Sequence, residues 1–276
     1  MPRFWIPFVE QCVRLAKAGE VWDLGGGVRG AWGNCLLPFT NEYYLTEPHG
    51  GAATDGGAVS LAESLAESLA RQFARAKEDA APRQLPWVFL LPNEGVNTLG
   101  FGETDAVAAR EGLAPFVLLA EMTGDVSTLA PPRRPLPALR MERIVDRAGC
   151  ALGMGINLDA YAMPRDFLES TVDAGMFYAR PDRDFGYLAY DGEVPVSTAE
   201  VVELDGWLYV AAVATAPGQQ RKGYAEAVMR YALEQASQAL GITRTALDAS
   251  EMGAPVYAAM GYKRTGAEWR VYGLPH

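Results

Sequence analysis

The sequence predicts an α/β (α+β) fold organised as two units of similar length. The chain has 276 residues, which is comfortable for two domains of about 140 residues each. Residues 129–139 carry four prolines in eleven residues, as expected of an extended linker, and they divide the chain near its midpoint. In both halves, apolar residues alternate between spacings typical of strands and of helices. We therefore expect two domains, residues 1–130 and 139–276, joined by a proline-rich linker at residues 131–138.

The elements of the first half begin with two strand-like segments, EVWDL and AWGNCLLPF. The residues between them, Gly25–Gly30, formally satisfy the GxGxxG pattern of dinucleotide sites. That pattern requires a helix to follow, whereas the next segment resembles a strand, so we interpret the glycines as a hairpin turn. The remaining predicted elements are a strand (NEYYLTEP), a helix (Val59 to about Lys77), a strand (LPWVFLLP), a helix (TDAVAAREGL) and a strand (APFVLLAEM).

The second half begins with a predicted strand, LRMERIV, and two helices, ALGMGINLDAY and RDFLESTVDAG. Strands are expected around MFYAR, FGYLAYDG and VSTAEVVEL. Asp205-Gly206 is typical of a two-residue hairpin turn, after which WLYVAAVAT continues the sheet. Apolar residues then recur at helical spacing from Tyr224 to Leu240. A strand (TALDAS), a short helix (APVYAAMGY) and a last strand (AEWRVYGL) complete the half. The order of elements in residues 207–274 repeats that in residues 41–122, which indicates a degenerate internal repeat.

Composition excludes several classes of function. The net charge of −10 disfavours a nucleic-acid binder, which needs a basic surface, and mildly favours a cationic or amine-bearing partner. Only two histidines are present, which argues against a histidine-rich metal site and against a Ser-His-Asp hydrolase, so we expect no metal. Cys12, Cys35 and Cys150 are widely spaced and are expected to be reduced core residues.

The sequence also bears on location. The best apolar run, Trp87–Leu91, is far shorter than the roughly 20 residues that span a membrane. The first residues, MPRFWIPFVEQC, carry charge within the apolar stretch and have no small-residue cleavage site. We therefore expect a cytoplasmic protein without a membrane or nucleic-acid partner.

The segment that points most clearly to chemistry is Gln220–Ala225, QRKGYA, at a predicted junction of strand and helix. It fits the pattern [R/Q]-x-x-G-x-[G/A]. Such a junction presents unpaired backbone amides and the positive end of a helix dipole, which together hold a pyrophosphate. Gly223 and Ala225 leave room for the backbone to approach the phosphates closely.

In this segment the chain resembles the GNAT superfamily of acyl-CoA-dependent N-acetyltransferases. The resemblance is sharpest over Val213–Met229, covers roughly residues 139–274 in element order, and is supported by APVYAAMGYKRTG (254–266). It implies two GNAT-like units, each a mixed, mostly antiparallel central sheet flanked by helices. It also implies transfer of an acetyl group from acetyl-CoA to an amine that attacks directly in a ternary complex.

The resemblance implies a role for each matching residue. Val213 and Thr215 lie on the strand whose backbone would pair with the pantetheine arm. Tyr257 matches the tyrosine that commonly protonates the departing thiolate; the alternative is a tyrosine packed in a helix groove. Glu251 departs from the family, many members of which have an asparagine there. Six residues would surround the pyrophosphate, mainly through backbone amides: Gln220, Arg221, Lys222, Gly223, Tyr224 and Ala225.

Glu200 is our candidate for the general base that takes a proton from the amine. In the hairpin turning at Asp205-Gly206, Glu200 should face Ala211, and we expect it to share a side of the sheet with Val213 and Thr215. A solvated strand carboxylate is the alternative interpretation.

The first half lacks the motif, because PHGGAATDGGAVS stands where the second half has PGQQRKGYA. Asp55 in that loop would repel a pyrophosphate, so we expect residues 1 to about 130 to be a scaffold or one wall of the acceptor site. Small amines, amino acids, peptide termini and antibiotics all remain open as acceptors, and so does the oligomeric state. The alternative function is a non-catalytic acyl-CoA-binding or interaction module.

Overall fold

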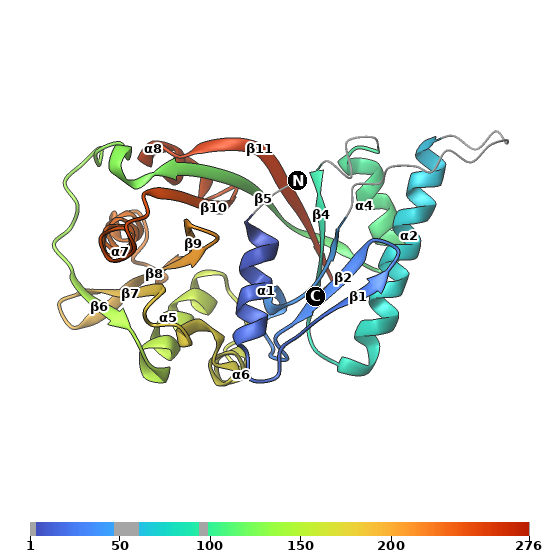
Figure 1. Cartoon of the computed structure of the whole chain (residues 1–276), viewed down its shortest axis with the longest axis horizontal. Coiled ribbons are helices and arrows are strands. Elements are labelled where there is room, and N and C mark those ends of the chain that lie inside the picture. The colour runs from blue at the N-terminus through green and yellow to red at the C-terminus, as the bar shows by residue number, and fades with distance from the viewer. Residues whose placement is uncertain (1–3, 47–60, 94–98, 276) are drawn as a thin grey trace. The chain divides into compact units, whose positions relative to one another are not determined.

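The computed structural model describes residues 4–46, 61–93 and 99–275, and within it the chain folds into two compact units (Figure 1). Unit 1 consists of Met1–Arg14, Ala18–Leu119 and Gly266–His276. Unit 2 consists of Leu15–Lys17 and Ala120–Thr265. This division differs from the boundaries drawn from the sequence at both ends of the second half, because two strands pass from one unit into the other.

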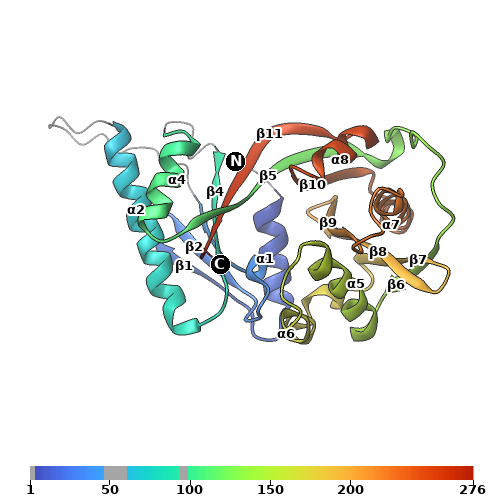
Figure 2. The same ribbon diagram turned by 180° about the vertical axis from the view of Figure 1, so that it is seen from behind.

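Unit 1 is built around a mixed sheet. Its strands lie in the order β1 (Glu20–Gly25), β2 (Val28–Trp32), β3 (Asn41–Leu45), β4 (Val88–Pro92) and β11 (Lys263–Gly273). The pair β3–β4 is parallel and the other pairs are antiparallel. Helix α2 (Leu61–Ala80) connects the parallel strands, and α4 (Phe101–Arg110) lies beside it in both views (Figures 1 and 2). The core is aromatic, with Trp32, Tyr43, Phe73, Phe89 and Tyr272 all fully buried.

The glycine-rich stretch of the first half is a turn, as the sequence predicts. Strands β1 and β2 pair antiparallel on either side of it, and Gly25, Gly26 and Gly27 all have positive φ, which glycine adopts without strain. The interpretation as a hairpin rather than a dinucleotide site is therefore confirmed. The predicted acidic loop around Asp55 lies outside the described residues.

Unit 2 is built on the same plan. Its strands lie in the order β5 (Ala114–Asp125), β10 (Arg244–Ser250), β9 (Trp207–Thr215), β8 (Val194–Leu204), β7 (Asp184–Asp191) and β6 (Arg140–Ile144). The pair β9–β10 is parallel, and β6 to β9 run antiparallel. Its helices are α5 (Arg147–Ala160), α6 (Phe167–Ala174), α7 (Tyr224–Leu240) and α8 (Ala254–Met260).

Helices α5 and α7 cover opposite faces of the unit 2 sheet (Figures 1 and 2). Val228, Leu233 and other apolar residues of α7 pack on one face with Val201 and Val210. Ile156 of α5 packs on the other face in a smaller cluster that includes Leu188, Tyr190 and Ala214. Alternation of side chains along each strand thus gives the sheet two distinct sides.

The internal repeat is visible as two strand–helix–parallel strand modules, β3–α2–β4 and β9–α7–β10. The closing strands of the two halves are exchanged. Strand β11, which follows α8, pairs with β4 through Trp269–Gly273, whereas β5 of the first half lies next to β10. This exchange moves residues 120–130 into unit 2 and residues 266–276 into unit 1.

The other differences from the predicted elements are local. MFYAR is not a strand: Met176–Tyr178 forms a 3₁₀ turn directly after Gly175, whose φ of +80° ends α6 and reverses the chain. Helix α1 (Trp5–Leu15) was not predicted. Cys12, Cys35 and Cys150 are buried and unpaired, as expected. No helix in the described part of the chain is long and apolar enough to cross a membrane.

Candidate active site

The parallel pairing of β9 with β10 stops part-way along both strands. Leu208–Val210 pair with Thr245–Leu247, although β9 continues to Thr215 and β10 to Ser250. Among the described residues, the β9 segment that follows Val210 has no ladder partner on this side. The edge can therefore pair with an extended ligand through backbone hydrogen bonds, as a sheet edge pairs with a strand.

A β-bulge at Ala212 lies in this unpaired segment. The register between β8 and β9 shifts between Thr198 and Glu200, and Ala212 has a φ of +49°, which is uncommon for a residue with a Cβ atom. The Asn157 side chain of α5 donates a hydrogen bond from Nδ2 to the Ala212 carbonyl oxygen at 3.0 Å. Since the bulge turns this carbonyl towards α5, Asn157 holds the distorted backbone in place.

The bulge changes which side chains share a face. Glu200 pairs with Ala211, as predicted, but beyond the bulge Thr198 pairs with Ala214 and Ser197 with Thr215. Thr215 therefore points to the same side as Ser197, on the face opposite to Glu200. The prediction that Glu200, Val213 and Thr215 share a face is wrong, because β9 contains an extra residue at the bulge that the sequence pattern did not indicate. Val213 packs with the α7 cluster instead.

A valine at position 212 should destabilise the protein. A β-branched side chain at positive φ is strained, so we expect Ala212→Val to lower the free energy of unfolding by ~1–3 kcal/mol. Ala212→Gly should be tolerated, because glycine adopts this conformation readily. The same substitution at Ala211, whose φ is not positive, is the matched control. Equal midpoints of chemical denaturation for Ala212→Val and Ala211→Val would contradict the strained bulge.

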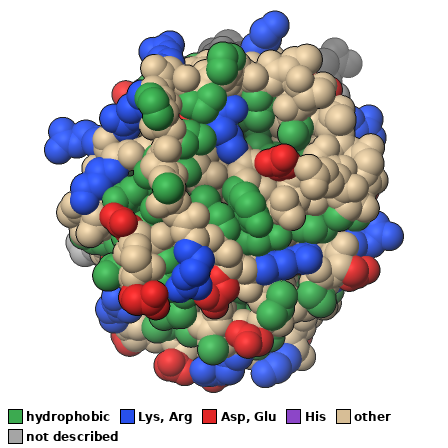
Figure 3. All heavy atoms as spheres, turned by 90° about the vertical axis from the view of Figure 1, so that its left-hand side faces the viewer, with side chains coloured by type: hydrophobic (Ala, Val, Ile, Leu, Met, Phe, Trp, Pro, Cys, Tyr) green, Lys and Arg blue, Asp and Glu red, His purple; other side chains and the backbone are tan. Residues whose placement is uncertain are grey.

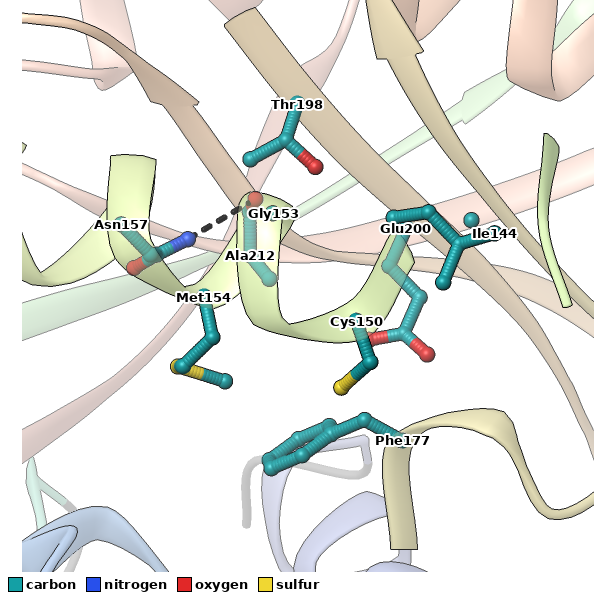
Figure 4. Close-up of a pocket in the computed structure, with 10 residues that line it drawn as sticks. Ile144, Cys150, Gly153, Met154, Asn157, Phe177, Thr198, Glu200 and Ala212 are labelled. Carbon is teal, nitrogen blue, oxygen red and sulfur yellow. Dashed lines mark hydrogen bonds between the residues drawn. The ribbon is translucent and has the colours of Figure 1, made fainter. Parts of the chain in front are cut away.

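Glu200 lies in a pocket between α5 and the sheet (Figure 4). Only 8% of its surface is exposed, so it is not a solvated strand carboxylate. Burial, reinforced by the nearby charge of Asp184, raises the pKa of Glu200 to about 8, and the Arg180 charge opposes this shift. The Glu200 carboxylate points towards Cys150 and Phe177 (Figure 4). A buried carboxyl with a pKa near neutrality is suited to exchange a proton with a bound ligand.

Cys150 is not suited to act as a nucleophile in this pocket. Burial and the neighbouring Glu200 carboxylate raise the pKa of its thiol to about 12, while the Arg147 charge lowers it. Because the thiolate is the reactive form, the thiol stays inert near neutral pH.

The loop that leads into α7 presents backbone amides at a helix N-terminus. Gly223 caps the helix with a φ of +88°, and no side chain caps the amides of the first turn. The Gln220 side chain accepts from the Gly218 amide at 3.0 Å through Oε1, so it braces the loop internally. The Tyr224 hydroxyl donates to Asp191, which ties that ring to β7. An anion fits such a set of amides and the positive end of the helix dipole.

Basic side chains surround this loop. Arg221 and Lys222 are exposed, and Arg134 of the proline-rich segment donates from Nη2 to the Arg221 carbonyl oxygen at 2.8 Å. A Cβ atom on Gly223 would lie 3.5 Å from Cδ of Pro137. On the side of the molecule that holds α7, both basic and acidic side chains lie around a central apolar area (Figure 3). The loop is thus locally basic in an acidic protein.

Tyr257 lies on α8, which follows β10, and its ring packs against the α7-side cluster. Burial raises the pKa of its hydroxyl, and the Tyr161 and Tyr262 side chains add to the shift. A phenol in this environment stays protonated at neutral pH and can donate its proton.

Comparisons with known proteins agree with this geometry. The family model of the acetyltransferase (GNAT) family matches residues 156–262, which include the bulge, the loop before α7 and Tyr257. Residues 156–262 therefore carry the sequence pattern of the GNAT acetyltransferase family. No curated protein matches the sequence.

Solved structures extend the likeness to the whole chain. A GCN5-related N-acetyltransferase from Kribbella flavida is 19% identical, with a TM-score of 0.67 over 100% of this chain and 95% of that one. One from Sphaerobacter thermophilus is 12% identical, with a TM-score of 0.60 over 91% and 78%. A tandem GNAT protein from the clavulanic acid biosynthesis pathway is 12% identical, with a TM-score of 0.52 over 90% and 79%. The chain therefore has the GNAT fold in a tandem arrangement.

The structure brings Glu200 to one side of the bulge and places Gln220–Ala225 at the α7 N-terminus. Tyr257 packs against the α7-side cluster and also interacts with Tyr161, whose hydroxyl donates to the Val213 carbonyl oxygen at 3.5 Å in the unpaired segment of β9. Sequence reasoning missed Asn157 and the carboxyl of Asp248. Asp248 comes directly after Leu247, the residue at which the pairing of β10 with β9 ends. Burial and the Glu121 charge raise the pKa of Asp248 to about 7, although the Tyr209 hydroxyl donates to it at 3.0 Å.

Proposed function

We propose that this protein is an acyl-CoA-dependent N-acetyltransferase that moves an acetyl group from acetyl-CoA to an amine by direct attack. The observation that carries the proposal is the buried Glu200 carboxyl beside the Ala212 bulge, where β9 and β10 cease to pair. A bound thioester and a proton acceptor can meet there. The GNAT family uses acyl-CoA, and the second half has the backbone features to hold it.

The residues present fit acetyl-CoA in two places. The unpaired edge of β9, including the backbone of Val213 and Thr215, would receive the pantetheine arm, since only its backbone groups are required. The amides of Gln220–Ala225 would hold the pyrophosphate, with Arg221 and Lys222 adding positive charge. When bound, acetyl-CoA supplies an acetyl group activated as a thioester.

Glu200 would take the proton that the acceptor nitrogen must lose. The nitrogen lone pair forms a bond to the carbonyl carbon, the carbon–sulfur bond breaks, and the proton moves from nitrogen to the Glu200 carboxylate. Tyr257 would donate its phenolic proton to the departing sulfur, so that CoA leaves as a thiol. Asp248 is the rival for the proton-accepting role, because its pKa is also raised towards neutrality.

Removing the Tyr257 hydroxyl should reduce turnover without weakening cofactor binding. We expect Tyr257→Phe to lower kcat by roughly 10²-fold, the size typical of a lost general acid, while the acetyl-CoA Kd changes little. Tyr262→Phe is the matched control, since the Tyr262 hydroxyl contacts Thr245 within the core. Steady-state thiol release and calorimetry provide the two readouts, and an unchanged kcat would remove Tyr257 from the chemistry.

Titration of the purified chain with acetyl-CoA by calorimetry tests the proposal as a whole, with free CoA and NADH as comparisons. We expect micromolar binding and one site per chain, because only the second half has the QRKGYA loop. Two sites per chain would overturn the view that the first half binds no cofactor. Binding without thiol release for any amine would favour the alternative, a non-catalytic acyl-CoA-binding module. No binding would leave an interaction module as the better account.

A further inference from the structure

The pocket around Glu200 is apolar apart from a few polar groups, most of which are already hydrogen bonded. Ile144, Cys150, Met154 and Phe177 form much of its wall. Of the polar lining residues, Thr198 donates to the Tyr187 carbonyl oxygen at 3.2 Å, and Asn157 donates to the Ala212 carbonyl oxygen at 3.0 Å. Glu200 is the one charged group among the lining residues, all of which belong to the described part of unit 2.

No lysine, arginine or histidine is among the residues that line this described pocket. Arg180, whose charge acts on Glu200, is already engaged by Asp184 through two hydrogen bonds of 2.6 and 3.2 Å. Arg147, whose charge acts on Cys150, is likewise paired with Glu169 and Asp173. A ligand that brings a negative charge into the pocket would therefore find a carboxylate and apolar side chains. Burying a carboxylate without a partner is strongly unfavourable.

We propose that the acceptor is a primary amine carried on an uncharged, apolar body, such as an alkylamine or arylalkylamine, and that this pocket rejects amino acids. The inference rests on the proposed function and specifies the substrate class of the same site. The Glu200 carboxylate and the ammonium form of such an acceptor make a neutral pair overall in the pocket. Phe177 and Met154 provide contacts for the apolar body.

The pocket also lies next to the place where the thioester is expected, so an amine bound in it would be close to the acetyl group. The pocket is bounded by Ala212, where the bulge brings the backbone of β9 towards α5, and by Glu200, which pairs with the adjacent Ala211. Figure 4 shows Asn157 and Ala212 joined at one side of the pocket and Glu200 with Cys150 at another. An amine bound to Glu200 would thus lie next to the bulge, where the thioester is expected.

Three related acceptors provide the test, and L-phenylalaninamide matches L-phenylalanine in size. 2-Phenylethylamine, L-phenylalanine and L-phenylalaninamide share the phenyl ring and the amine, and only L-phenylalanine bears a carboxylate. We expect kcat/KM, measured by thiol release with saturating acetyl-CoA, to be at least roughly 100-fold lower for L-phenylalanine than for 2-phenylethylamine. L-Phenylalaninamide should recover most of the difference, because its amide is neutral.

A positive charge introduced into the pocket lining also tests whether the pocket selects against a carboxylate on the acceptor. Met154→Lys, on the pocket side of α5, should lower kcat/KM for 2-phenylethylamine at least tenfold and raise the ratio of L-phenylalanine to 2-phenylethylamine turnover. Leu152→Lys adds the same charge on α5 at a residue that is 46% exposed and outside the pocket, so it should change neither value. Thermal denaturation checks that both variants are folded.

The outcomes separate this inference from the proposed function. Equal or faster acetylation of L-phenylalanine would overturn the substrate class and leave the acetyltransferase activity in place. Stoichiometric acetyl-CoA binding with no acetylation of 2-phenylethylamine or hexylamine would also overturn the substrate class. Absence of acetyl-CoA binding would overturn the proposed function, and this inference with it.

Discussion

Replacing Gly223 by glutamate should abolish detectable binding of acetyl-CoA, with a loss of affinity of roughly 100-fold or more. Gly223 has a φ of +88° at the start of α7, so any other residue is strained there. A glutamate would add a negative charge where the helix dipole and the loop amides are expected to hold a pyrophosphate. A Cβ atom would lie 3.5 Å from Pro137, an ordinary contact distance, so the expected effect comes from the backbone strain and the added charge.

Gly241→Glu is the matched control for this variant. Gly241 lies at the other end of α7, has a φ of +69°, and has no atom within 4 Å of the position of an added Cβ atom. It therefore carries the same backbone strain and the same added charge without contact to the loop. We expect both variants to lose stability and only Gly223→Glu to lose acetyl-CoA binding by calorimetry. Retained affinity in Gly223→Glu would refute the placement of the pyrophosphate.

Replacing Glu200 by glutamine should lower kcat by roughly 10²- to 10⁴-fold, the range typical of a removed general base. In the wild-type protein the pKa of about 8 means that most Glu200 carboxyls hold a proton at pH 7. Since the deprotonated form accepts the amine proton, kcat/KM should rise with pH and level off above about pH 8. The inflection should be absent in Glu200→Gln. If Asp248→Asn removes it instead, the proton acceptor is Asp248.

Glu203→Gln is the control for Glu200→Gln on the same strand. Glu203 pairs with Leu208 and accepts from the Gly206 amide at 3.0 Å, so its carboxylate serves the hairpin turn. The Glu203→Gln variant should therefore retain full turnover.

Glu200→Gln should also be more stable than the wild type at pH 8 or above. The pKa of Glu200 in the folded protein is raised above its value in the unfolded chain. The free energy of unfolding of the wild type therefore falls as the pH rises towards and through 8, because the buried carboxyl must then lose its proton. A lower melting temperature for Glu200→Gln at pH 9 would contradict the burial argument.

Local sequence patterns predicted the elements of the second half well. Tyr224–Leu240 is a helix with the bounds read from its apolar spacing, and the Asp205-Gly206 turn sets the register that pairs Glu200 with Ala211. Both depend on residues close in sequence, whose preferences are strong. The same reasoning failed two residues further along β9, because a bulge is stabilised by contacts that are distant in sequence, here from Asn157.

Two other features could not be predicted from the sequence, because they too depend on contacts between residues that are distant in the chain. The exchange of β5 and β11 depends on which strand edge is free after the sheets assemble, and no single segment encodes it. The Gln220–Ala225 loop was recognisable because its residue types are dictated by local backbone geometry. Asp248 was missed because its importance comes from burial beside Tyr209 and Glu121, which lie on neighbouring strands. A carboxylate within an apolar strand is the pattern that could have indicated it.

The pairing of β4 with β11 has a consequence for biosynthesis. Val88 and its partner Gly273 are separated by about 185 residues of chain. At translation rates of about 5–20 residues per second, a nascent chain that has completed β4 waits roughly 10–40 s before β11 emerges from the ribosome. Throughout that interval the first sheet has an open hydrogen-bonding edge. The strand that completes the unit 1 sheet beside β4 is therefore the last strand to be synthesised.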